Sequence, residues 1–593
     1  MAENNQLEKI RHSCSHVLAA AVSKLYPRVK LAIGPAIEDG FYYDFDFGQK
    51  KISEKDLAKI SKEMEKIIKT KAPFKKENVT IEKAKAVFKN QSFKLELIAD
   101  LVKEEKVKKV SLYQTGDFVD LCAGPHVTNT SKIGPFQLLS IAGAYWRGDE
   151  KKPMLTRLYG ACFTTKKALD EHLKILEEAK ERDHRKLNYA LKLYQISNEM
   201  GQGLVTLLPN GTIIAEELEN WAKKTEEEWG YIRVMTPHIA KESLFKKTGH
   251  VPHYLESMYP PMRMKEKGAG ETDLYYLKPM NCSMHALVFK SEPKSYRDLP
   301  LRIAEYGTVY RYEKSGELHG MMRVRGPIHQ NDAHIFCTEE QAEEEFQKVM
   351  ELHQYYYKTL GLSEKDYYLS YATRDEKNKG KFLGNDKMWE KAQKITLKYV
   401  KQSKIPYEIE EGGAAFYGPK IDFNIKTVTG KVFSASTNQL DFFIPQVFNL
   451  KYADKDGKQK TPVCIHRAPL GAHVRFIAFL TEHYAGAFPV WLSPVQAIVV
   501  PITDKHNLYG QKIVEQLNEE NLRVKIDTRN ETTSAKIRDA ELQKIPYILV
   551  VGDKERKAKN VNVRVRGEKS HGPMSVLEFT SLIKEDIAKK RQV

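Results

Sequence analysis

The chain has 593 residues, of which 41% are hydrophobic and 10% aromatic, and it carries a formal net charge of +17. This length exceeds what one hydrophobic core supports and predicts about three or four domains, while the apolar content excludes a disordered polymer. The basic excess favours an anionic partner, of which nucleic acid is the commonest large one, although an ordinary protein with lysine-rich surfaces carries the same charge.

The six cysteines are scattered and show no Cys-x-x-Cys spacing, which predicts a reducing compartment. The N-terminal sequence MAENNQLEKI lacks the basic-then-apolar pattern of a signal peptide. No stretch approaches the roughly 18 apolar residues of a membrane span. We therefore expect a soluble, cytoplasmic protein without a membrane partner.

A helix is expected over Leu7–Leu25, where apolar residues recur at helical spacing. It opens a unit that extends to about residue 180. This unit holds an HxxxH pair and a CxxxH pair, made of His12, His16, Cys122 and His126. Their number suits a tetrahedral zinc site, although an HxxxH pair on a helix is more often structural.

Two further helical patterns complete this part of the chain. Residues 50–110 are interpreted as lysine-rich amphipathic helices with solvated faces. Residues 166–190 are interpreted as one long charged helix that links the unit to the next. From about 191 to 490 the pattern is mixed, with a helix over EELENWAKKTEEEW and then a strand that ends at Pro237.

An antiparallel hairpin is expected where two β-type runs, Tyr306–Tyr312 and Met321–Val324, flank the turn-forming segment EKSGELHG. Charged side chains crowd this hairpin: Arg311, Glu313, Arg323 and Arg325. An arginine can hold two phosphate oxygens at once and does not lose its charge, so the pattern suits phosphate binding. A salt-bridged, exposed hairpin would show the same pattern.

Strands and helices alternate over residues 495–593. VQAIVVPI, LRVKIDT, PYILVVGD and VNVRVR are expected to be strands, with helices around 508–519 and 533–544 and at the C-terminus. This order predicts a small α/β domain with a mostly parallel sheet. Such a fold has many uses and indicates no function by itself.

The run Tyr310-Arg311-Tyr312-Glu313 resembles motif 2 of the class II aminoacyl-tRNA synthetases, and LHGMMRVRG followed by NDAHIFCTEEQ is similar to the bacterial-type threonyl branch. CIHRAPLGAHVR resembles motif 3, and the helix–strand–Pro237 order resembles motif 1, which implies a homodimer. The resemblance implies an α+β multidomain protein. Its parts would be an editing domain over 1–180 with a linker helix to about 190, an antiparallel-sheet catalytic domain over 191–490, and an anticodon-binding domain over 495–593.

The implied reaction is activation of threonine with ATP to threonyl-adenylate, followed by transfer to tRNA(Thr). ATP with Mg²⁺ would be bound by Arg311, Glu313, Arg323, Arg325 and Arg475. The threonine pocket would be lined by Gln330, Asp332, Tyr417 and Gln439. The candidate catalytic residues are Arg311, Arg475 and Lys420, which would act by positioning and charge neutralisation rather than through a covalent intermediate.

The resemblance also implies a zinc ion held by Cys282, His334 and His466, which lie 52 and 132 residues apart, so no local spacing assembles them. Three protein ligands leave one position for the threonine amino and hydroxyl groups. Such a site rejects valine but not serine, so mischarged Ser-tRNA(Thr) needs a separate hydrolytic site.

Two further sets of residues follow from the resemblance alone. The editing cluster, which needs no obligatory metal, would be His12, His16, Lys94, Asp120, Cys122 and His126. Anticodon contacts would fall on Asn530, Glu555 and Arg564.

The chain departs from the family pattern in four places. No ubiquitin-like domain precedes HSCSH, Ser283-Met284 stands where Pro-Gly is usual, Val474 stands where Glu is frequent, and GPIHQNDAH is one residue longer. Every zinc ligand and motif arginine is retained, so we expect an active enzyme with altered loops.

Three other functions are weighed against this one. A nucleic-acid-binding or regulatory protein derived from a synthetase would have lost a motif arginine or a zinc ligand. A metal-dependent hydrolase acting through the N-terminal cluster would account for half of the function at most, because intact synthetase motifs follow residue 191. A synthetase for proline or serine would lack this Cys–His–His set.

Overall fold

The computed structural model describes residues 2–149, 151–264, 273–427, 432–567 and 569–592. The chain divides into two compact units, Met1–Leu176 and Glu177–Val593, and each has a hydrophobic core of its own. Among the described residues, no helix has the length and apolar character needed to cross a membrane.

The first unit is organised around helix α1 (Ala2–Leu25), which confirms the helix expected at the start of the chain. Its apolar face packs against an antiparallel sheet and against helix α2 (Glu54–Lys69). The sheet has the order β1-β3-β8-β7, with β2 beside β3. Its strands are β1 (Lys30–Leu31), β2 (Ala36–Ile37), β3 (Gly40–Asp46), β7 (Phe136–Tyr145) and β8 (Met154–Cys162).

The interpretation of residues 50–110 as helices is wrong in part. Helices α2, α3 (Ile81–Val87) and α4 (Ser92–Glu104) are present, but β4 (Phe74–Thr80) lies between them and pairs with β5 (Lys109–Thr115). Only Val79 of β4 is buried, so the strand is held by backbone pairing and shows no apolar alternation in sequence. β5 then pairs with β6 (Phe118–Leu121), which ends the three-stranded sheet.

The expected single linker helix is also wrong, because two helices occupy that stretch. Helix α5 (Lys166–Arg182) ends before Asp183, and α6 (His184–Leu191) begins after it. The Asp183 carboxylate accepts a hydrogen bond from the Arg185 backbone N–H at 2.8 Å. An aspartate in this position satisfies a donor that the helix itself cannot, so it starts a new helix.

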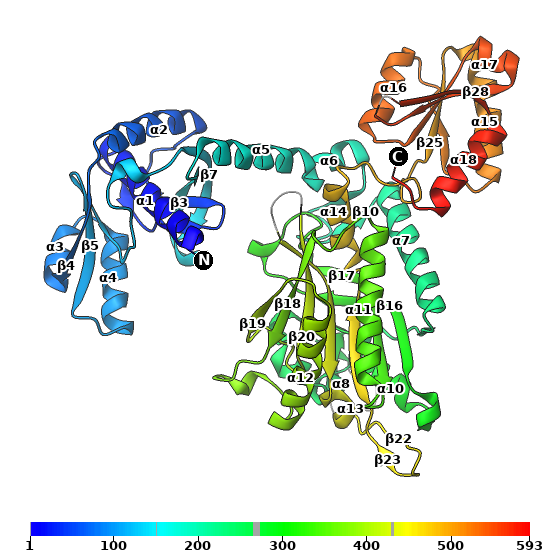
Figure 1. The fold of residues 1–593 in the computed structure, drawn as a ribbon, viewed down its shortest axis with the longest axis horizontal. Coiled ribbons are helices and arrows are strands. Elements are labelled where there is room, and N and C mark those ends of the chain that lie inside the picture. Colours follow the sequence, from blue (N-terminus) through cyan, green and yellow to red (C-terminus); the bar gives the residue numbers. More distant parts are fainter. Residues whose placement is uncertain (1, 150, 265–272, 428–431, 568, 593) are drawn as a thin grey trace. The chain divides into compact units, whose positions relative to one another are not determined.

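An eight-stranded sheet forms the centre of the second unit, in the order β11-β16-β17-β24-β21-β20-β18-β19 (Figure 1). Only the two outermost pairings are parallel, which confirms the expected antiparallel catalytic sheet. The strands are β11 (Ile232–Arg233), β16 (Leu301–Arg311), β17 (Gly326–Cys337), β18 (Tyr367–Thr373), β19 (Tyr407–Glu411), β20 (Lys420–Lys426), β21 (Val432–Asp441) and β24 (Val463–Ala468).

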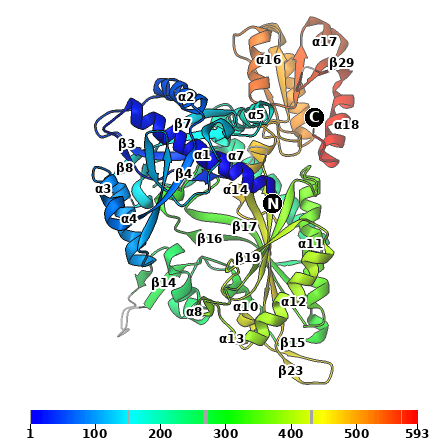
Figure 2. The ribbon, with the colours of Figure 1, turned by 60° about the vertical axis from the view of Figure 1, so that its left-hand side comes forward.

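Long helices contribute buried side chains to the core of this sheet. They are α7 (Pro209–Glu228), α11 (Ala342–Thr359), α12 (Asp386–Gln402) and α14 (His473–His483). Helices α11 and α12 lie on one face of the sheet (Figure 2). Short helices α8 (Glu242–Lys247), α9 (His250–His253), α10 (Cys282–Lys290) and α13 (Phe443–Val447) accompany them.

Smaller sheets flank the central one and position its loops. Their strands are β9 (Tyr194–Ile196), β10 (Val205–Leu207), β12 (Ile239–Lys241), β13 (Met262–Met264), β14 (Asp273–Leu277), β15 (Lys294–Ser295), β22 (Tyr452–Ala453) and β23 (Gln459–Lys460).

The predicted arginine-rich hairpin exists, but its second strand is not the predicted one. β16 pairs with β17, with Arg311 opposite Gly326, whereas Met321–Val324 belongs to the connecting loop. Met321 and Val324 are buried because this loop folds back onto the protein core. The run is therefore apolar for a reason other than strand formation.

The C-terminal part forms a five-stranded sheet in the order β26-β25-β27-β28-β29. β25 pairs in parallel with β26 and β27, but β28 and β29 are antiparallel, so the mostly parallel sheet expected here is wrong. Only helix α17 (Asp553–Ala558) separates β27 from β28, which is too short for a parallel crossover.

The elements of this sheet region otherwise follow the expected order, except that helix α17 and strand β29 were not expected. They are β25 (Ala497–Pro501), α15 (Asn507–Glu519), β26 (Val524–Ile526), α16 (Thr533–Leu542), β27 (Tyr547–Val551), β28 (Asn560–Val565), β29 (Lys569–Ser575) and α18 (Val576–Ala588).

A buried ion pair ties helix α7 to the central sheet. Arg467 on β24 donates from Nη1 to Glu226 at 2.7 Å and to the Asn331 carbonyl at 2.9 Å. Both charged side chains are buried, so neither can be hydrated if its partner is lost. On the same helix, Glu217 pairs with Arg523 at a partly exposed position.

We expect Glu226→Ala to lower the free energy of unfolding of the second unit by about 3–5 kcal/mol, because Arg467 would remain buried without its carboxylate. Glu217→Ala is the matched control on α7 and should cost at most about 1 kcal/mol. Urea unfolding followed by tryptophan fluorescence measures both variants. Equal losses would contradict the view that burial sets the energy of the Arg467 pair.

Candidate functional site

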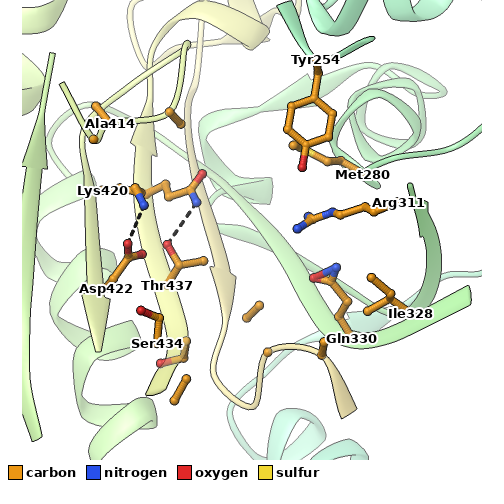
Figure 3. Close-up of a pocket in the computed structure, with 18 of the residues that line it drawn as sticks. Tyr254, Met280, Arg311, Ile328, Gln330, Ala414, Lys420, Asp422, Ser434 and Thr437 are labelled. Atoms are coloured by element: carbon orange, nitrogen blue, oxygen red, sulfur yellow. Dashed lines mark hydrogen bonds and ion pairs between the residues drawn. The ribbon is translucent and has the colours of Figure 1, made fainter. Parts of the chain in front are cut away.

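A cavity of about 550 Å³ opens over the eight-stranded sheet. Figure 3 shows Arg311 and Gln330 on one side of it and Lys420 and Asp422 on the other. Residues from β16, β17, β20, β21 and the start of α14 line its wall, and the segment 412–417 closes one edge. Strands adjacent in space but distant in sequence thus contribute to one pocket.

Three of the predicted phosphate-binding arginines, Arg311, Arg323 and Arg475, line this cavity. The Nε atoms of Arg311 and Arg475 are buried and, within the described parts of the chain, have no hydrogen-bond partner. Burial, together with the charges of Arg323 and Arg311, lowers the pKa of Arg475 to about 10. Positive charge with unused donors would favour an anion at this end of the cavity.

The two remaining charged residues of the hairpin differ in position. Glu313 lines the cavity and lies 3.9 Å from the Arg323 guanidinium. Arg325 is not among the lining residues; its Nε donates to the Glu313 carbonyl at 2.7 Å, and its guanidinium lies over the Tyr312 ring. Arg325 therefore braces the loop that carries Glu313.

The residues predicted to form the substrate pocket lie beside the arginines. Gln330, Tyr417 and Gln439 all line the cavity, and the Tyr417 hydroxyl donates to Gln439 at 2.5 Å. Lys420 lies opposite Gln439 on the neighbouring strand and forms an ion pair with Asp422 at 2.5 Å.

Asp332 lies two residues beyond Gln330 on β17 and is not among the residues that line the cavity. It accepts a hydrogen bond from Asn281 Nδ2 at 2.9 Å, and burial raises the pKa of its carboxyl group.

Cys282, His334 and His466 come together although they are far apart in sequence, with their ligand atoms within 4.8 Å of one another. The pairing of β17 with β24 places His334 directly opposite His466, and Cys282 is the first residue of α10. Asp441 accepts from His466 Nε2 at 2.9 Å, and His334 Nδ1 lies 2.8 Å from His285 Nδ1. His334 Nε2 is buried and, within the described residues, has no hydrogen-bond partner.

This donor set fits a zinc ion. One thiol and two imidazoles match the soft and borderline ligands that zinc prefers, and the unpartnered His334 Nε2 is available to a ligand. Burial and the charges of Asp332 and Asp441 raise the pKa of Cys282, and burial lowers that of His334. A bound cation would reverse the first effect by stabilising the thiolate.

In the first unit, the HxxxH and CxxxH pairs also form one cluster. Cys122 Sγ lies 3.4 Å from His12 Nε2 and 3.3 Å from His126 Nε2. Burial lowers the pKa of His126 to about 2 and raises that of Cys122 to about 11. Ser13 holds His126 from the other side through Nδ1, at 3.1 Å.

Asp120 joins the rest of the predicted cluster. It pairs with the buried Lys94 at 2.5 Å and lies 3.8 Å from His16. The Tyr43 hydroxyl also donates to it at 2.7 Å. Sequence reasoning missed Tyr43, because its strand FYYDFD reads as ordinary core and carries no separate signal.

Asp183, His184 and Glu482 form a third group of metal-binding type, which hydrogen bonds account for. His184 Nδ1 lies 2.7 Å from Glu482, and its Nε2 accepts from the Met321 backbone N–H at 3.2 Å. Both ring nitrogens are used, so this histidine fixes the loop between β16 and β17.

The three predicted anticodon residues lie on separate elements of the C-terminal sheet region. Asn530 is exposed in the loop after β26, and Arg564 is half-buried on β28. Glu555 accepts from the Gly552 backbone N–H at 2.9 Å and so caps α17. No hydrogen bond or ion pair joins these three side chains to one another in the described structure.

Sequence reasoning also missed the wall formed by Tyr254, Met280 and Phe416. Behind Met280 lies the buried His250, whose Nε2 is 3.3 Å from the Met280 sulfur. Burial lowers the pKa of His250 to about 3. Tyr254, Met280 and Phe416 lie in irregular segments, so no periodicity in the sequence identifies them.

Three family models match the chain. They describe the class II core domain of the Gly, His, Pro, Ser and Thr tRNA synthetases (residues 266–484), an anticodon-binding domain (496–586), and the second additional domain of threonyl and alanyl tRNA synthetases (110–159).

Individual proteins match over almost the whole chain. A threonine–tRNA ligase of Sulfurihydrogenibium sp. is 46% identical over 99% of this chain and 90% of its own length. One from Porphyromonas gingivalis is 43% identical over 97% of this chain and 87% of its own length.

Two solved structures are also similar. The RNA-binding domain of threonyl-tRNA synthetase from Cryptosporidium parvum has a TM-score of 0.63 at 33% identity and covers 68% of this chain and 98% of its own. A threonyl-tRNA synthetase-type protein, ThrRS-1 from Aeropyrum pernix, has a TM-score of 0.60 at 27% identity, over 69% of this chain and 96% of its own.

The neutral histidines of the first unit predict its response to acid. His126 has a pKa of about 2 when folded and near 6.5 when unfolded, so the unfolded state binds more protons and stability falls as the pH drops below about 6.5. The loss from His126 alone is about 1.4 kcal/mol at pH 5.5. The pKa values of His12 and His16 are also lowered by burial and act in the same direction.

Hydrogen exchange of α1 peptides, corrected for the intrinsic pH dependence of exchange, should therefore show weaker protection at pH 5.5 than at pH 7.5. In His126→Gln the difference should shrink, because one titrating group is gone. Unchanged protection at pH 5.5 would show that these imidazoles are not held neutral.

Proposed function

The chain belongs to the threonyl-tRNA synthetases, and we propose that the cavity over its antiparallel sheet is where threonine, ATP and the end of tRNA(Thr) meet. It is a threonine–tRNA ligase with a class II catalytic core, an anticodon-binding domain and the additional domain associated with editing. The observation that carries the site assignment is the convergence of Cys282, His334 and His466 behind the arginine-lined cavity, where the lining residue Tyr417 stacks on the His466 ring.

ATP would occupy the end of the cavity lined by Arg311, Arg323 and Arg475. The unused Nε donors of Arg311 and Arg475 and the repulsion among the three guanidinium groups support a triphosphate there, because a polyanion would accept hydrogen bonds and offset the positive charge. ATP chemistry on a class II core implies Mg²⁺, which would share the phosphate charge. Glu313, held by Arg325, would contact the adenine, and Lys420 would neutralise charge near the threonine carboxylate.

Threonine would occupy the opposite end, next to Cys282, His334 and His466. Zinc held by these residues would supply a Lewis-acid position for the substrate's amino and hydroxyl groups. Gln330, Tyr417 and Gln439 would surround the side chain, and Asp332 would accept a hydrogen bond from it. The reaction would then be accelerated mainly by holding the carboxylate against the α-phosphorus of ATP.

The cluster in the first unit would hydrolyse mischarged Ser-tRNA(Thr). Asp120, fixed by Lys94 and Tyr43, and the neutral His12, His16 and His126 offer acceptors that can orient a water toward the seryl ester. Cys122 and the histidines could hold a metal by count, but the hydrolysis proposed here needs none.

Four further assignments complete the proposal: domain bounds, anticodon contacts, oligomeric state and location. The domains would span 1–180, 191–490 and 495–593, and Asn530, Glu555 and Arg564 would contact the anticodon. Ile232 is 50% and Met235 98% exposed, which supports a homodimer formed through the β11 segment. A cytoplasmic location suits six cysteines that are all reduced.

Amino-acid-dependent ATP–pyrophosphate exchange tests the catalytic proposal. We expect exchange with threonine, weaker exchange with serine, none with valine, and loss of exchange on chelation or in Cys282→Ser. Cys337→Ser is the matched control, since Cys337 is buried on β17 but outside the ligand set. Full exchange from metal-free protein would contradict the zinc site.

Deacylation of Ser-tRNA(Thr) tests the editing proposal. Asp120→Asn should slow deacylation by about 10²-fold or more, because the carboxylate that pairs with Lys94 and accepts from Tyr43 becomes a neutral amide with a single acceptor oxygen, while threonine activation stays unchanged. Asp117→Asn, at the exposed turn before β6, is the control and should deacylate normally. Normal deacylation by Asp120→Asn would move the hydrolytic site elsewhere.

A further inference from the structure

A chain of hydrogen-bonding groups leads away from the metal-binding trio into the protein interior. It begins at His334 Nδ1, which lies 2.8 Å from Nδ1 of His285. The Nε2 atom of His285 lies 3.0 Å from the Glu305 carboxylate. His334, His285 and Glu305 are all buried, and the two imidazole rings meet edge to face at 90°. Water therefore does not reach these three groups, so it cannot reverse which of them donates a hydrogen bond.

Glu305 is held in place by further donors. The Thr236 backbone N–H and hydroxyl donate to it at 3.0 and 2.8 Å, and Lys278 Nζ donates at 3.1 Å. Lys278 is fully buried and also donates to the Thr236 hydroxyl at 2.8 Å. A buried ion pair of this kind adds little net stability over apolar packing, so the network calls for another explanation.

With both imidazoles neutral, the donors along this series of groups have only one consistent arrangement. An ionised carboxylate can only accept, so His285 must carry its proton on Nε2 and present a lone pair at Nδ1. His334 must then donate from Nδ1, which leaves its Nε2 lone pair unprotonated. Nε2 is the buried His334 atom without a partner in the described structure.

The geometry points to His285 and Glu305 as positioning residues that hold His334 in its metal-binding tautomer and orientation. This inference rests on the metal site proposed above and extends it to residues that contact no substrate. Outer groups of this type fix ring orientation and raise the basicity of a ligating histidine. His466 receives the equivalent support directly from Asp441, at 2.9 Å.

The spacing of Cys282 and His285 explains how helix α10 supplies both a ligand and the group that orients another ligand. Cys282 and His285 lie three residues apart on α10 and therefore on the same face of the helix. One turn of α10 thus supplies a metal ligand and the group that orients a second ligand on β17. Glu305 lies opposite Asp332 in the pairing of β16 with β17. The hairpin that carries His334 therefore also carries Glu305, the last group in this series of hydrogen bonds.

The test compares cobalt-substituted holoenzyme carrying His285→Leu with the wild type. The leucine leaves the His334 Nδ1–H buried and unpaired, so we expect metal affinity, measured by chelator competition, to fall 10–100-fold. The cobalt absorption bands should shift, and the KM for threonine should rise while the KM for ATP stays unchanged. His285→Gln, whose amide can accept at one end and donate at the other, should restore most of the affinity.

The control is His506→Leu, which removes a buried histidine 3.3 Å from the Asp553 carboxylate in the C-terminal sheet region. It should leave metal affinity and the cobalt bands unchanged. If His285→Leu does not fold, His285→Asn takes its place. The asparagine side chain is too short to reach both His334 and Glu305, so this variant should lower the metal affinity about 10-fold.

The outcomes separate the two proposals. A wild-type protein that binds neither zinc nor cobalt at Cys282 would overturn the metal site and this inference with it. A wild type that binds metal, alongside a folded His285→Leu or His285→Asn variant with the same affinity and spectrum, would overturn the inference alone. Loss in both variants, with rescue by glutamine, would support it.

Discussion

The antiparallel register of β17 between β16 and β24 is the constraint on which the site depends. It sets His334 against His466 on one side and Glu305 against Asp332 on the other. A slip of one residue would turn every one of these side chains to the opposite face. The backbone hydrogen bonds of the strands thus fix His334 beside His466, and Cys282 joins them from the start of α10.

Two neighbouring regions of the second unit carry opposite charge. In the cavity, Arg311, Arg323 and Arg475 repel one another, and the buried Nε atoms of Arg311 and Arg475 lack partners in the described structure, so an anion there would offset an existing cost. Behind the lining residue Tyr417, which stacks on His466, one thiol and two imidazoles lie close to Asp332 and Asp441, so a cation there would have the same effect. Groups that are already in place lower the cost of binding.

Local patterns predicted some elements well and others badly, for identifiable reasons. The α1 helix and the strand–helix order after residue 495 were predictable, because apolar spacing repeats there. Strand β4 was missed because it buries a single side chain, and Met321–Val324 was taken for a strand because a buried loop is also apolar. The break at Asp183 shows a capping residue outweighing a continuous charged pattern.

The sequence by itself determined the chemistry available: which thiols, imidazoles and guanidinium groups exist, and the motifs that relate them to a family. The sequence also predicted the hairpin that bears Arg311, because residues close in sequence remain close in space across a turn. Only the tertiary structure decided that Cys282, His334 and His466 meet, that Arg325 lies outside the cavity lining and braces the loop of Glu313, and that His285 and Glu305 stand behind His334. Those relations depend on strand register and burial, which join residues too distant in sequence for any local spacing to encode.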